Sequence, residues 1–252
     1  MYTQSSREAL GRESAVKVPP LMEVVLITKL KSAFDRKLAE AFVREGCRVF
    51  ASGGSEITGV TLLPDDLAQA RALVEKSAGK IDLYVDTSDE RSAADNFTIR
   101  GGLDEKVIRG LYEANVLWPM AALEAFLPLL DAGGGKRLCF LTSAEASVNE
   151  TRDIAGYAYK LGKAAMHNFF QMISNKLTPS GYTLRVYDPM QGGTFGTARS
   201  GGGPYREVVP ELAAEGALNY FTRRRGTENK DPLRDDETRL VFRDALGREH
   251  TW

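Results

Sequence analysis

Met22-Glu-Val-Val-Leu-Ile27 is an apolar run, and an amphipathic segment at residues 33–45 follows it almost directly. A strand that is buried on both faces, as in a parallel sheet, shows such a run instead of a strict alternation of apolar and polar residues. Gly46 then ends the predicted helix, and a second apolar run begins at Cys47. This strand–helix–strand order predicts an α/β structure with parallel strands.

The alternation continues along the chain. Further strands are predicted at residues 48–51, 60–63, 81–85, 137–142, 183–187 and 239–243. Further helices are predicted at residues 65–77, 104–130, 157–177 and 210–221, the second of them interrupted near Asn115 and Pro119. Parallel strands joined by helices predict a doubly wound sheet in three αβα layers. We expect a single domain over residues 21–252, preceded by an N-terminal extension at residues 1–20.

Length, composition and charge limit the possible classes. The chain has 252 residues, 43% of them hydrophobic, and 33 basic against 34 acidic residues. One large core is therefore possible, and the balanced charge favours neither nucleic acid nor an anionic membrane as a partner. Cys47 and Cys139 lie in apolar runs and are predicted to be buried and unpaired. His167 and His250 are too far apart in sequence to indicate a metal site. The two cysteines make no disulfide framework, so we expect a cytoplasmic protein. No apolar run reaches the roughly 18 to 20 residues that span a bilayer.

Tyr159 and Lys163 stand four positions apart in a predicted helix. Positions i and i+4 share one face of a helix, so the two side chains can lie together. A free tyrosine has a pKa of about 10, and a nearby fixed cation favours the phenolate. We therefore expect the pKa of Tyr159 to be lowered toward the range useful for acid–base catalysis. A tyrosine packed on a lysine stem is the purely structural alternative.

Other polar residues occur at suggestive positions around this pair. Thr142 and Ser143 end the predicted strand at residues 137–142, and Asn115 lies in the long helical segment before it. In order and approximate spacing, Asn115, Ser143, Tyr159 and Lys163 resemble the Asn-Ser-Tyr-Lys tetrad of the short-chain dehydrogenase/reductase family.

The resemblance extends over about residues 24–189 and implies a Rossmann-like fold. In that family the tyrosine exchanges a proton with the substrate oxygen, and the serine holds that oxygen. The lysine lowers the pKa of the tyrosine and contacts the nicotinamide ribose, and the asparagine holds a water in a proton relay. The resemblance implies these catalytic roles for Tyr159, Ser143, Lys163 and Asn115, respectively. The interval from Ser143 to Tyr159 is longer than usual in the family, so Thr142 or Ser147 is an alternative to Ser143.

The family's phosphate-binding loop, Thr-Gly-x-x-x-Gly-x-Gly, is strongly altered. The chain has Thr28-Lys-Leu-Lys-Ser-Ala-Phe-Asp35 at this place, with every glycine replaced. Those glycines let the backbone approach the pyrophosphate, and Asp35 adds a negative charge near the helix N-terminus where phosphate would sit. Lys29 and Lys31 can instead attract a phosphate, although a solvated helix start explains them equally well. We expect Thr28, Lys29, Lys31 and Ser52 to contact a bound cofactor, and the resemblance implies the same for Lys163.

Two further cofactor landmarks differ from the family pattern. No acidic residue follows the second predicted strand, which reads Ser52-Gly-Gly at its end, so the usual NAD signature is missing and the balance favours NADP slightly. The family's Asn-Asn-Ala-Gly is represented by Asp86-Thr-Ser-Asp89, which we expect to put carboxylates on the adenine side of the cofactor.

Three functions remain open from the sequence. The leading one is an atypical oxidoreductase that interconverts a small alcohol and a carbonyl compound with NADP or NAD, bound weakly. The second is non-redox chemistry on the same fold by a lyase, isomerase or dehalogenase-like enzyme. The third is a non-catalytic binding subunit that has lost the dinucleotide. The resemblance also implies a homodimer or homotetramer.

Overall fold

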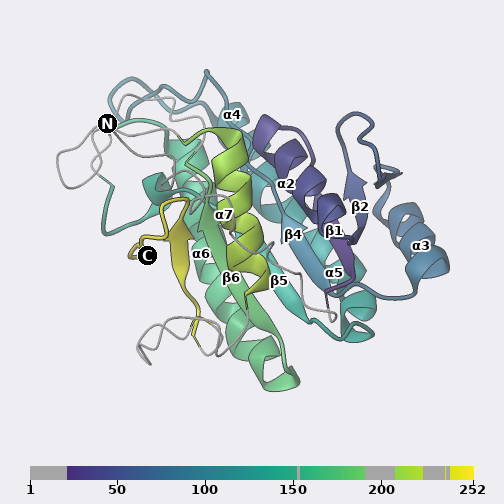
Figure 1. Ribbon diagram of the computed structural model, residues 1–252. Coiled ribbons are helices and arrows are strands. Elements are labelled where there is room, and N and C mark those ends of the chain that lie inside the picture. Colours follow the sequence, from purple (N-terminus) through teal and green to yellow (C-terminus); the bar gives the residue numbers. More distant parts are fainter. Residues whose placement is uncertain (1–21, 152–153, 191–207, 224–235, 237–238) are drawn as a thin grey trace, which may run out of the picture.

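The computed structural model of the chain describes residues 22–151, 154–190, 208–223, 236 and 239–252 (Figure 1). In these residues seven parallel strands form one sheet, in the order β3-β2-β1-β4-β5-β6-β7. The strands are β1 (Val24–Thr28), β2 (Arg48–Ser52), β3 (Val60–Leu63), β4 (Leu83–Asp86), β5 (Arg137–Leu141), β6 (Thr183–Asp188) and β7 (Phe242–Asp244). The predicted extension at residues 1–20 lies outside the described residues.

Helices cover both faces of this sheet. They are α2 (Ala33–Arg44), α3 (Leu67–Ala78), α4 (Glu105–Tyr112), α5 (Trp118–Asp131), α6 (Tyr157–Leu177) and α7 (Pro210–Thr222), with short turns η1 (Glu113–Leu117), η2 (Ala144–Ala146) and η3 (Thr178–Ser180). In Figure 1, α2 and α7 lie in front of the sheet, and α5 and α6 lie behind it. The predicted doubly wound sheet in three αβα layers is therefore confirmed.

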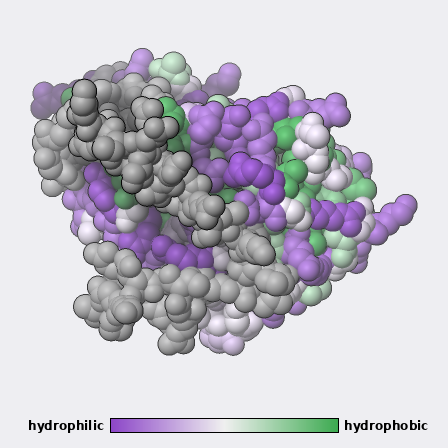
Figure 2. All heavy atoms as spheres, viewed as in Figure 1, coloured by the Kyte–Doolittle hydropathy of each residue, from purple (hydrophilic) through white to green (hydrophobic). Residues whose placement is uncertain are grey.

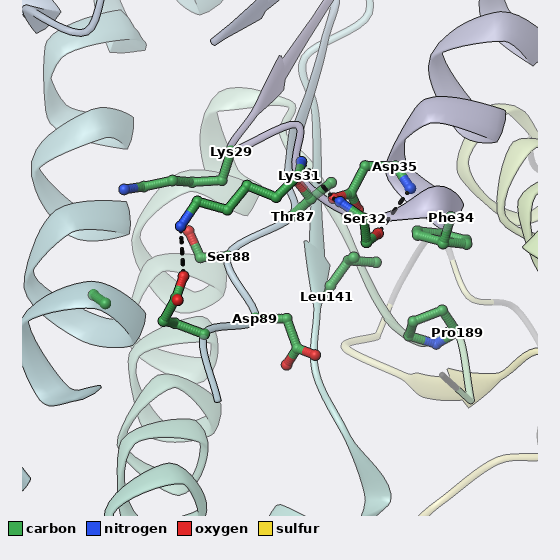
Figure 3. A pocket seen from close by; sticks show the side chains of 12 residues that line it. Lys29, Lys31, Ser32, Phe34, Asp35, Thr87, Ser88, Asp89, Leu141 and Pro189 are labelled. Carbon is green, nitrogen blue, oxygen red and sulfur yellow. Dashed lines mark hydrogen bonds and ion pairs between the residues drawn. The ribbon is translucent and has the colours of Figure 1, made fainter. Parts of the chain in front are cut away.

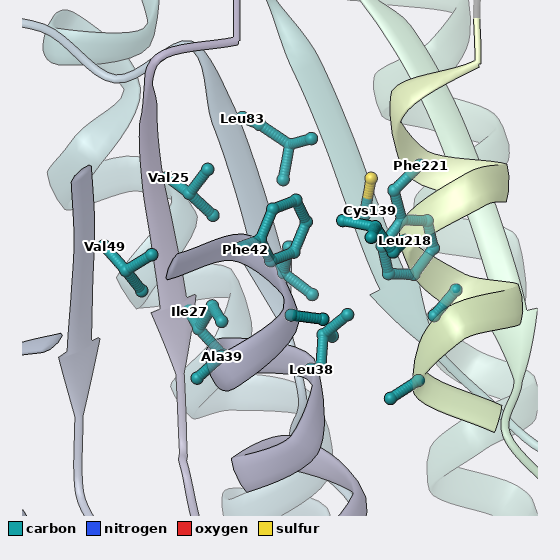
Figure 4. Packing of buried hydrophobic residues seen from close by; sticks show 14 of the residues in the cluster. Val25, Ile27, Leu38, Ala39, Phe42, Val49, Leu83, Cys139, Leu218 and Phe221 are labelled. Atoms are coloured by element: carbon teal, nitrogen blue, oxygen red, sulfur yellow. The ribbon is translucent and has the colours of Figure 1, made fainter. Parts of the chain in front are cut away.

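Each central strand sends alternate side chains into two hydrophobic clusters. Val25 and Ile27 of β1 pack with α2 and α7 on one face, where Phe42 and Phe221 also lie (Figure 4). Leu26 belongs to the cluster on the opposite face, which α3, α5 and α6 close. Because both faces are covered, β1 is buried along its whole length, which explains its run of apolar residues.

The long helical segment predicted at residues 104–130 consists of α4 and α5 joined by the π-helical turn η1. This turn contains Asn115, so the predicted interruption is a local widening of the helix. The segment stops before Gly133, where only glycine fits. A Cβ atom at Gly133 would lie 1.9 Å from the carbonyl oxygen of Ile81.

The C-terminal part of the chain departs from the sequence-based expectation. The last strand was predicted at residues 239–243, but β7 is Phe242–Asp244 and pairs with β6. After β7 the chain returns to place His250 between two carboxylates, with Nδ1 3.0 Å from Glu150 Oε2 and Nε2 2.9 Å from Asp244 Oδ2.

The described residues bear on the cysteines, on metal-binding groups and on membrane-spanning helices. The predicted burial of Cys47 and Cys139 is confirmed, and both are free thiols. The side chains described include no group of histidine, cysteine and acidic residues that could hold a metal ion. Among the helices described, none combines the length and apolarity that crossing a bilayer requires. The described part of the surface seen in Figure 2 is mainly hydrophilic, with hydrophobic residues scattered over it.

Candidate active site

The chain order in the sheet reverses between β1 and β4, and ligands of such sheets bind beyond the strand ends at this position. A pocket of about 90 Å³ lies there. Its lining comes from the ends of β1, β4, β5 and β6, from the start of α2, and from η1 (Figure 3). The register pairs Thr28 with Asp86 at these ends, and Thr28 Oγ1 donates a hydrogen bond to Asp86 Oδ1 at 2.7 Å. Thr28, one of the predicted cofactor contacts, is therefore bonded within the sheet and is 1% exposed.

A carboxylate of the chain itself occupies the start of α2. Asp35 Oδ2 accepts hydrogen bonds from the backbone N–H groups of Lys31 (3.0 Å) and Ser32 (2.7 Å). Ser32 Oγ in turn accepts from the Asp35 N–H at 3.1 Å, which completes a capping box. Burial raises the pKa of Asp35 to about 6, against the opposing effect of these hydrogen bonds. The N–H groups that would otherwise bind an anion at this helix terminus are thus already used.

Ser52 at the end of β2 closes the other side of the same loop. Its hydroxyl oxygen accepts from the Lys29 N–H at 3.3 Å, and its carbonyl oxygen accepts from the Leu30 N–H at 2.8 Å. Gly54 lies so near that a Cβ atom there would be 2.2 Å from the Leu30 carbonyl oxygen. Ser52, another predicted cofactor contact, therefore holds the loop after β1 against the end of β2.

The two loop lysines have partners within the chain as well. Figure 3 shows both extending to the same side of the pocket, away from Asp35. The ammonium group of Lys29 lies 4.0 Å from the ring centroid of Trp118, in a cation–π contact. Lys31 Nζ lies 2.6 Å from Glu90 Oε2 in an exposed ion pair.

Tyr159 lies in the first turn of α6 with its hydroxyl group between two charged side chains. The phenol donates a hydrogen bond to Asp89 Oδ1 at 2.6 Å, and Arg91 Nη2 donates to the phenol oxygen at 2.7 Å. The Arg91 guanidinium also lies 3.9 Å from the centroid of the tyrosine ring. Arg91, and not Lys163, is therefore the cation that contacts the phenol oxygen.

Lys163 is on the same face of α6, as predicted, but its ammonium is directed to other partners. Lys163 Nζ donates to the carbonyl oxygens of Ser88 and, at 3.3 Å, of Leu141. It also pairs with Asp89 Oδ1 at 3.3 Å, while the ring centroid of Tyr159 is 5.8 Å away. Lys163 thus acts on the tyrosine through the shared carboxylate of Asp89.

The expectation of a lowered tyrosine pKa is wrong. Burial raises the pKa of Tyr159 well above its ordinary value, and the neighbouring carboxylates of Asp89 and Glu145 add to this effect. The Arg91 guanidinium opposes it without overcoming it. For Asp89, burial acts to raise the pKa, but Lys163 and Arg91 outweigh burial and hold the pKa below the usual range. At neutral pH the pair is a protonated phenol and an ionised carboxylate.

The three candidate hydroxyl groups near β5 do not hydrogen-bond to Tyr159 in the described residues; each is bonded to another partner. These partners are the N–H of Glu145 for Ser143 Oγ (3.2 Å), His167 Nε2 for Thr142 Oγ1 (2.6 Å) and the N–H of Glu150 for Ser147 Oγ (3.2 Å). Ser143 is followed by η2, which carries Glu145 to the Arg91 guanidinium at 3.2 Å. Of the three hydroxyl residues, Ser143 is therefore the one that connects to Tyr159 through hydrogen bonds of Glu145 and Arg91.

Asn115 is bonded to the backbone of the loop after β4. Its Oδ1 accepts from the Glu90 N–H and its Nδ2 donates to the Glu90 carbonyl oxygen, both at 2.8 Å. Both side-chain polar atoms of Asn115 are thus used to fix Glu90. The water-holding role that the resemblance implied for Asn115 stays a prediction.

Sequence reasoning missed Asp89 and Arg91 as neighbours of the tyrosine. It placed the carboxylates of the segment 86–89 on the adenine side of a cofactor, whereas Asp89 lies against Tyr159 and Lys163. The available signal was the run of charged residues that replaces a small, neutral family motif.

The residues of this pocket do not provide the pyrophosphate site that a nicotinamide dinucleotide, the cofactor implied by the sequence resemblance, uses in such folds. The N–H groups that would bind its pyrophosphate donate to Asp35 and Ser52. The carboxylates of Asp35, Asp89 and Glu90 line the pocket and would repel phosphate.

Comparison with known proteins gives partial matches in sequence. No protein-family profile matches the chain. The chain is 29% identical over 118 residues to 1-hydroxy-2-glutathionyl-2-methyl-3-butene dehydrogenase of Rhodococcus sp. (strain AD45), which covers 47% of this chain and 51% of that protein. It is 29% identical over 89 residues to C-signal of Myxococcus xanthus, which covers 35% of this chain and 54% of that protein. The match thus spans about half the length of these curated relatives.

Solved structures match over most of the chain. Carbonyl reductase Sniffer of D. melanogaster has a TM-score of 0.72 at 15% identity, over 92% of this chain and 100% of that one. A short-chain dehydrogenase/reductase from Burkholderia multivorans with bound NADP has a TM-score of 0.68 at 17% identity, with the same coverage. A protein described as a dehalogenation enzyme has a TM-score of 0.57 at 20% identity, over 66% of this chain and 71% of that one. The chain therefore has the fold of the short-chain dehydrogenase/reductase family and resembles oxidoreductases of that type in part of its sequence.

Proposed function

We propose that the chain is an enzyme of short-chain dehydrogenase/reductase fold that transfers a proton between Tyr159 and an oxygen atom of a small alcohol or carbonyl compound, without a dinucleotide. The supporting observation is a contrast between two sites near the carboxyl ends of the strands, the surroundings of Tyr159 and the start of α2. Tyr159 lies between a carboxylate and a guanidinium, whereas the place for a pyrophosphate is filled by Asp35. Eliminations, isomerisations and related non-redox reactions need only the first of these two sites.

The geometry gives Tyr159 the role of a general acid. Its raised pKa keeps the phenol protonated at neutral pH. A substrate oxygen that replaces Asp89 as the acceptor receives this proton, and the phenolate that remains keeps the hydrogen bond from Arg91. A charged donor that is already in place stabilises developing negative charge at low reorganisation cost. Lys163 meanwhile holds the displaced carboxylate of Asp89 in its ionised form.

The test measures proton chemistry in the absence of any nucleotide. A general acid that protonates a carbonyl oxygen accelerates enolisation, so the α-protons of hydroxyacetone should exchange with D₂O faster in the presence of the protein, as followed by proton NMR. We expect Tyr159→Phe to lower the catalysed exchange by about 10²-fold or more. Tyr157→Phe is the matched control, because the Tyr157 hydroxyl accepts a bond from the Ile99 N–H outside this network. Exchange that is equal in the native and Tyr159→Phe proteins would instead support a non-catalytic binding subunit.

A second candidate function is a nicotinamide-dependent oxidoreductase with weak cofactor binding and some preference for NADP. The curated relative that is a dehydrogenase and the similar structure with bound NADP favour it, as do Lys29 and Lys31 at the pocket. Calorimetric titration with NADPH and NADH separates the two candidates. Binding in the micromolar to low millimolar range supports the oxidoreductase. No heat and no change in nicotinamide fluorescence at millimolar concentrations supports the non-redox enzyme.

A further inference from the structure

Glu145 has a buried carboxylate oxygen without a hydrogen-bond partner. The side chain is 9% exposed, and its Oε1 accepts from Arg91 Nη1 at 3.2 Å. Its Oε2 is buried and has no hydrogen-bond partner within the described part of the chain. A buried acceptor left unpaired destabilises the folded state, and native structures seldom leave one without a reason.

A small cavity lies beside this carboxylate. Its lining residues are Arg91, Ser92, Asp95, Glu145, Gly156, Tyr159 and Lys160. The volume is about 10 Å³, which is just enough for one group of the size of a water molecule or a hydroxyl. The cavity therefore has room for a single polar group of a ligand whose remaining atoms lie outside it.

One guanidinium joins Glu145 to the catalytic candidate. Arg91 donates to Glu145 from Nη1 and to the phenol oxygen of Tyr159 from Nη2. Nη1 and Nη2 are bonded to the same carbon atom of Arg91, so their two acceptors lie close together. One small molecule can therefore place one oxygen at the phenol of Tyr159 and a second polar group at Glu145.

The charges of the lining indicate what the missing partner is. Asp95 uses both carboxylate oxygens as acceptors from the N–H groups of Ala158 (3.0 Å) and Tyr159 (2.9 Å) at the start of α6. The cations Arg91 and Lys160 balance the carboxylates of Asp95 and Glu145 in this lining, so the cavity calls for no further charge. A neutral hydroxyl group supplies the proton that Glu145 Oε2 can accept and adds no charge.

We propose that Glu145 binds a hydroxyl group of the substrate next to the oxygen that Tyr159 protonates, so that the site selects hydroxy-carbonyl compounds and diols over their singly functional analogues. This inference rests on the proposed function and defines its substrate class. A site built to hydrogen-bond a hydroxyl rejects the analogue without it, because the buried acceptor is then left unpaired.

Hydroxyacetone and acetone are a suitable probe pair because they differ by one hydroxyl group. Their dissociation constants are measured by ligand-observed saturation-transfer NMR on the native protein, on Glu145→Gln and on Glu145→Leu. We expect hydroxyacetone to bind at least about tenfold more tightly than acetone to the native protein, this preference to be smaller in Glu145→Gln, which lacks the negative charge, and the two ketones to bind equally to Glu145→Leu. The affinity for acetone should not change. Glu124→Gln, at an exposed position of α5, is the matched control and should keep the preference. If Glu145→Gln fails to fold, Glu145→Leu removes the polar atoms at similar volume.

Three results would overturn the proposal. They are equal affinities of the two ketones for the native protein, no binding of either ketone up to molar concentration, and a preference of unchanged size in Glu145→Gln or Glu145→Leu. Any of these results would mean that Glu145 Oε2 hydrogen-bonds to a buried water molecule and to no group of the substrate. Tyr159→Phe separates this inference from the proposed function. A preference for hydroxyacetone that persists in Tyr159→Phe, together with no catalysed exchange in the native protein, would retain the hydroxyl site and reject the proton-transfer chemistry.

Discussion

Replacement of Asp35 by asparagine is expected to stabilise the protein at neutral and alkaline pH. The side chain is 3% exposed, and burial raises its pKa to about 6 from an ordinary 3.8. Since the folded state binds this proton more tightly than the unfolded state, the free energy of unfolding falls as the pH rises through this interval. Both N–H donors, from Lys31 and Ser32, bond to the same oxygen, Oδ2. The single amide oxygen of asparagine can therefore accept both bonds while the buried charge disappears.

The size of the effect follows from the two pKa values of Asp35. Their difference corresponds to about 3 kcal/mol at pH 8, and to about half of that at pH 5. Urea unfolding of the native protein and of Asp35→Asn from about pH 4 to about pH 8 measures this difference in the free energy of unfolding. The gap between the two free energies of unfolding should widen by roughly this amount toward pH 8. Asp66→Asn removes an exposed capping carboxylate from α3 and is the matched control. A gap that is constant with pH, or that closes as the pH rises, would refute the reasoning.

Four other substitutions test the core, a helix end, a helix interior and the C-terminal region. Gly133→Ala would put a Cβ atom against the backbone of Ile81, so we expect denaturant unfolding to show a loss of about 1–3 kcal/mol. Gly110→Ala, in α4 with no heavy atom within 4 Å, should instead stabilise by about 0.5–1 kcal/mol. Phe140→Ala removes a fully buried ring and should cost about 3–5 kcal/mol, visible as a lower thermal midpoint; a loss below 1 kcal/mol would contradict the packing described. Burial lowers the pKa of His250, but its two flanking carboxylates outweigh burial and raise it, so this stabilisation is present in acid and is lost as the pH rises through the folded pKa. The thermal midpoint of His250→Gln should therefore fall less than that of the native protein as the pH rises through this range. An identical pH dependence of the two midpoints would exclude the stabilisation by His250.

The helices and strands of the fold were predictable because their apolar residues repeat clearly at the spacing of a helix or form continuous buried runs. The helix Tyr157–Leu177 and the strand Val60–Leu63 have the bounds expected from sequence. The last strand was misplaced by up to three residues at its start, because several consecutive residues there suit a strand equally well. Only the pairing of Phe242 with Val186 in β6 decides which of them join the sheet.

The candidate site was predictable only in part, because some of its residues lie in a helix and others in a loop without a regular pattern. Helix spacing places Tyr159 and Lys163 on one face of α6, and both are buried there. Their nearest charged partners, Asp89 and Arg91, come from the loop after β4, which has no period from which the direction of a side chain can be inferred. The direction of the pKa change of Tyr159 depends on burial and on these loop residues, so sequence spacing alone gave the wrong sign.

The amide of Asn115 holds the backbone of Glu90 at both its N–H and its carbonyl oxygen, and Asp89 and Arg91 are the residues on either side. An attempt to engineer nicotinamide binding into this protein must therefore do more than return glycines to the loop after β1. As long as Asn115 holds Glu90, the side chains of Asp89 and Arg91 stay against the Tyr159 hydroxyl, and Asp89 keeps the Lys163 ammonium as well, so both groups remain engaged within the chain.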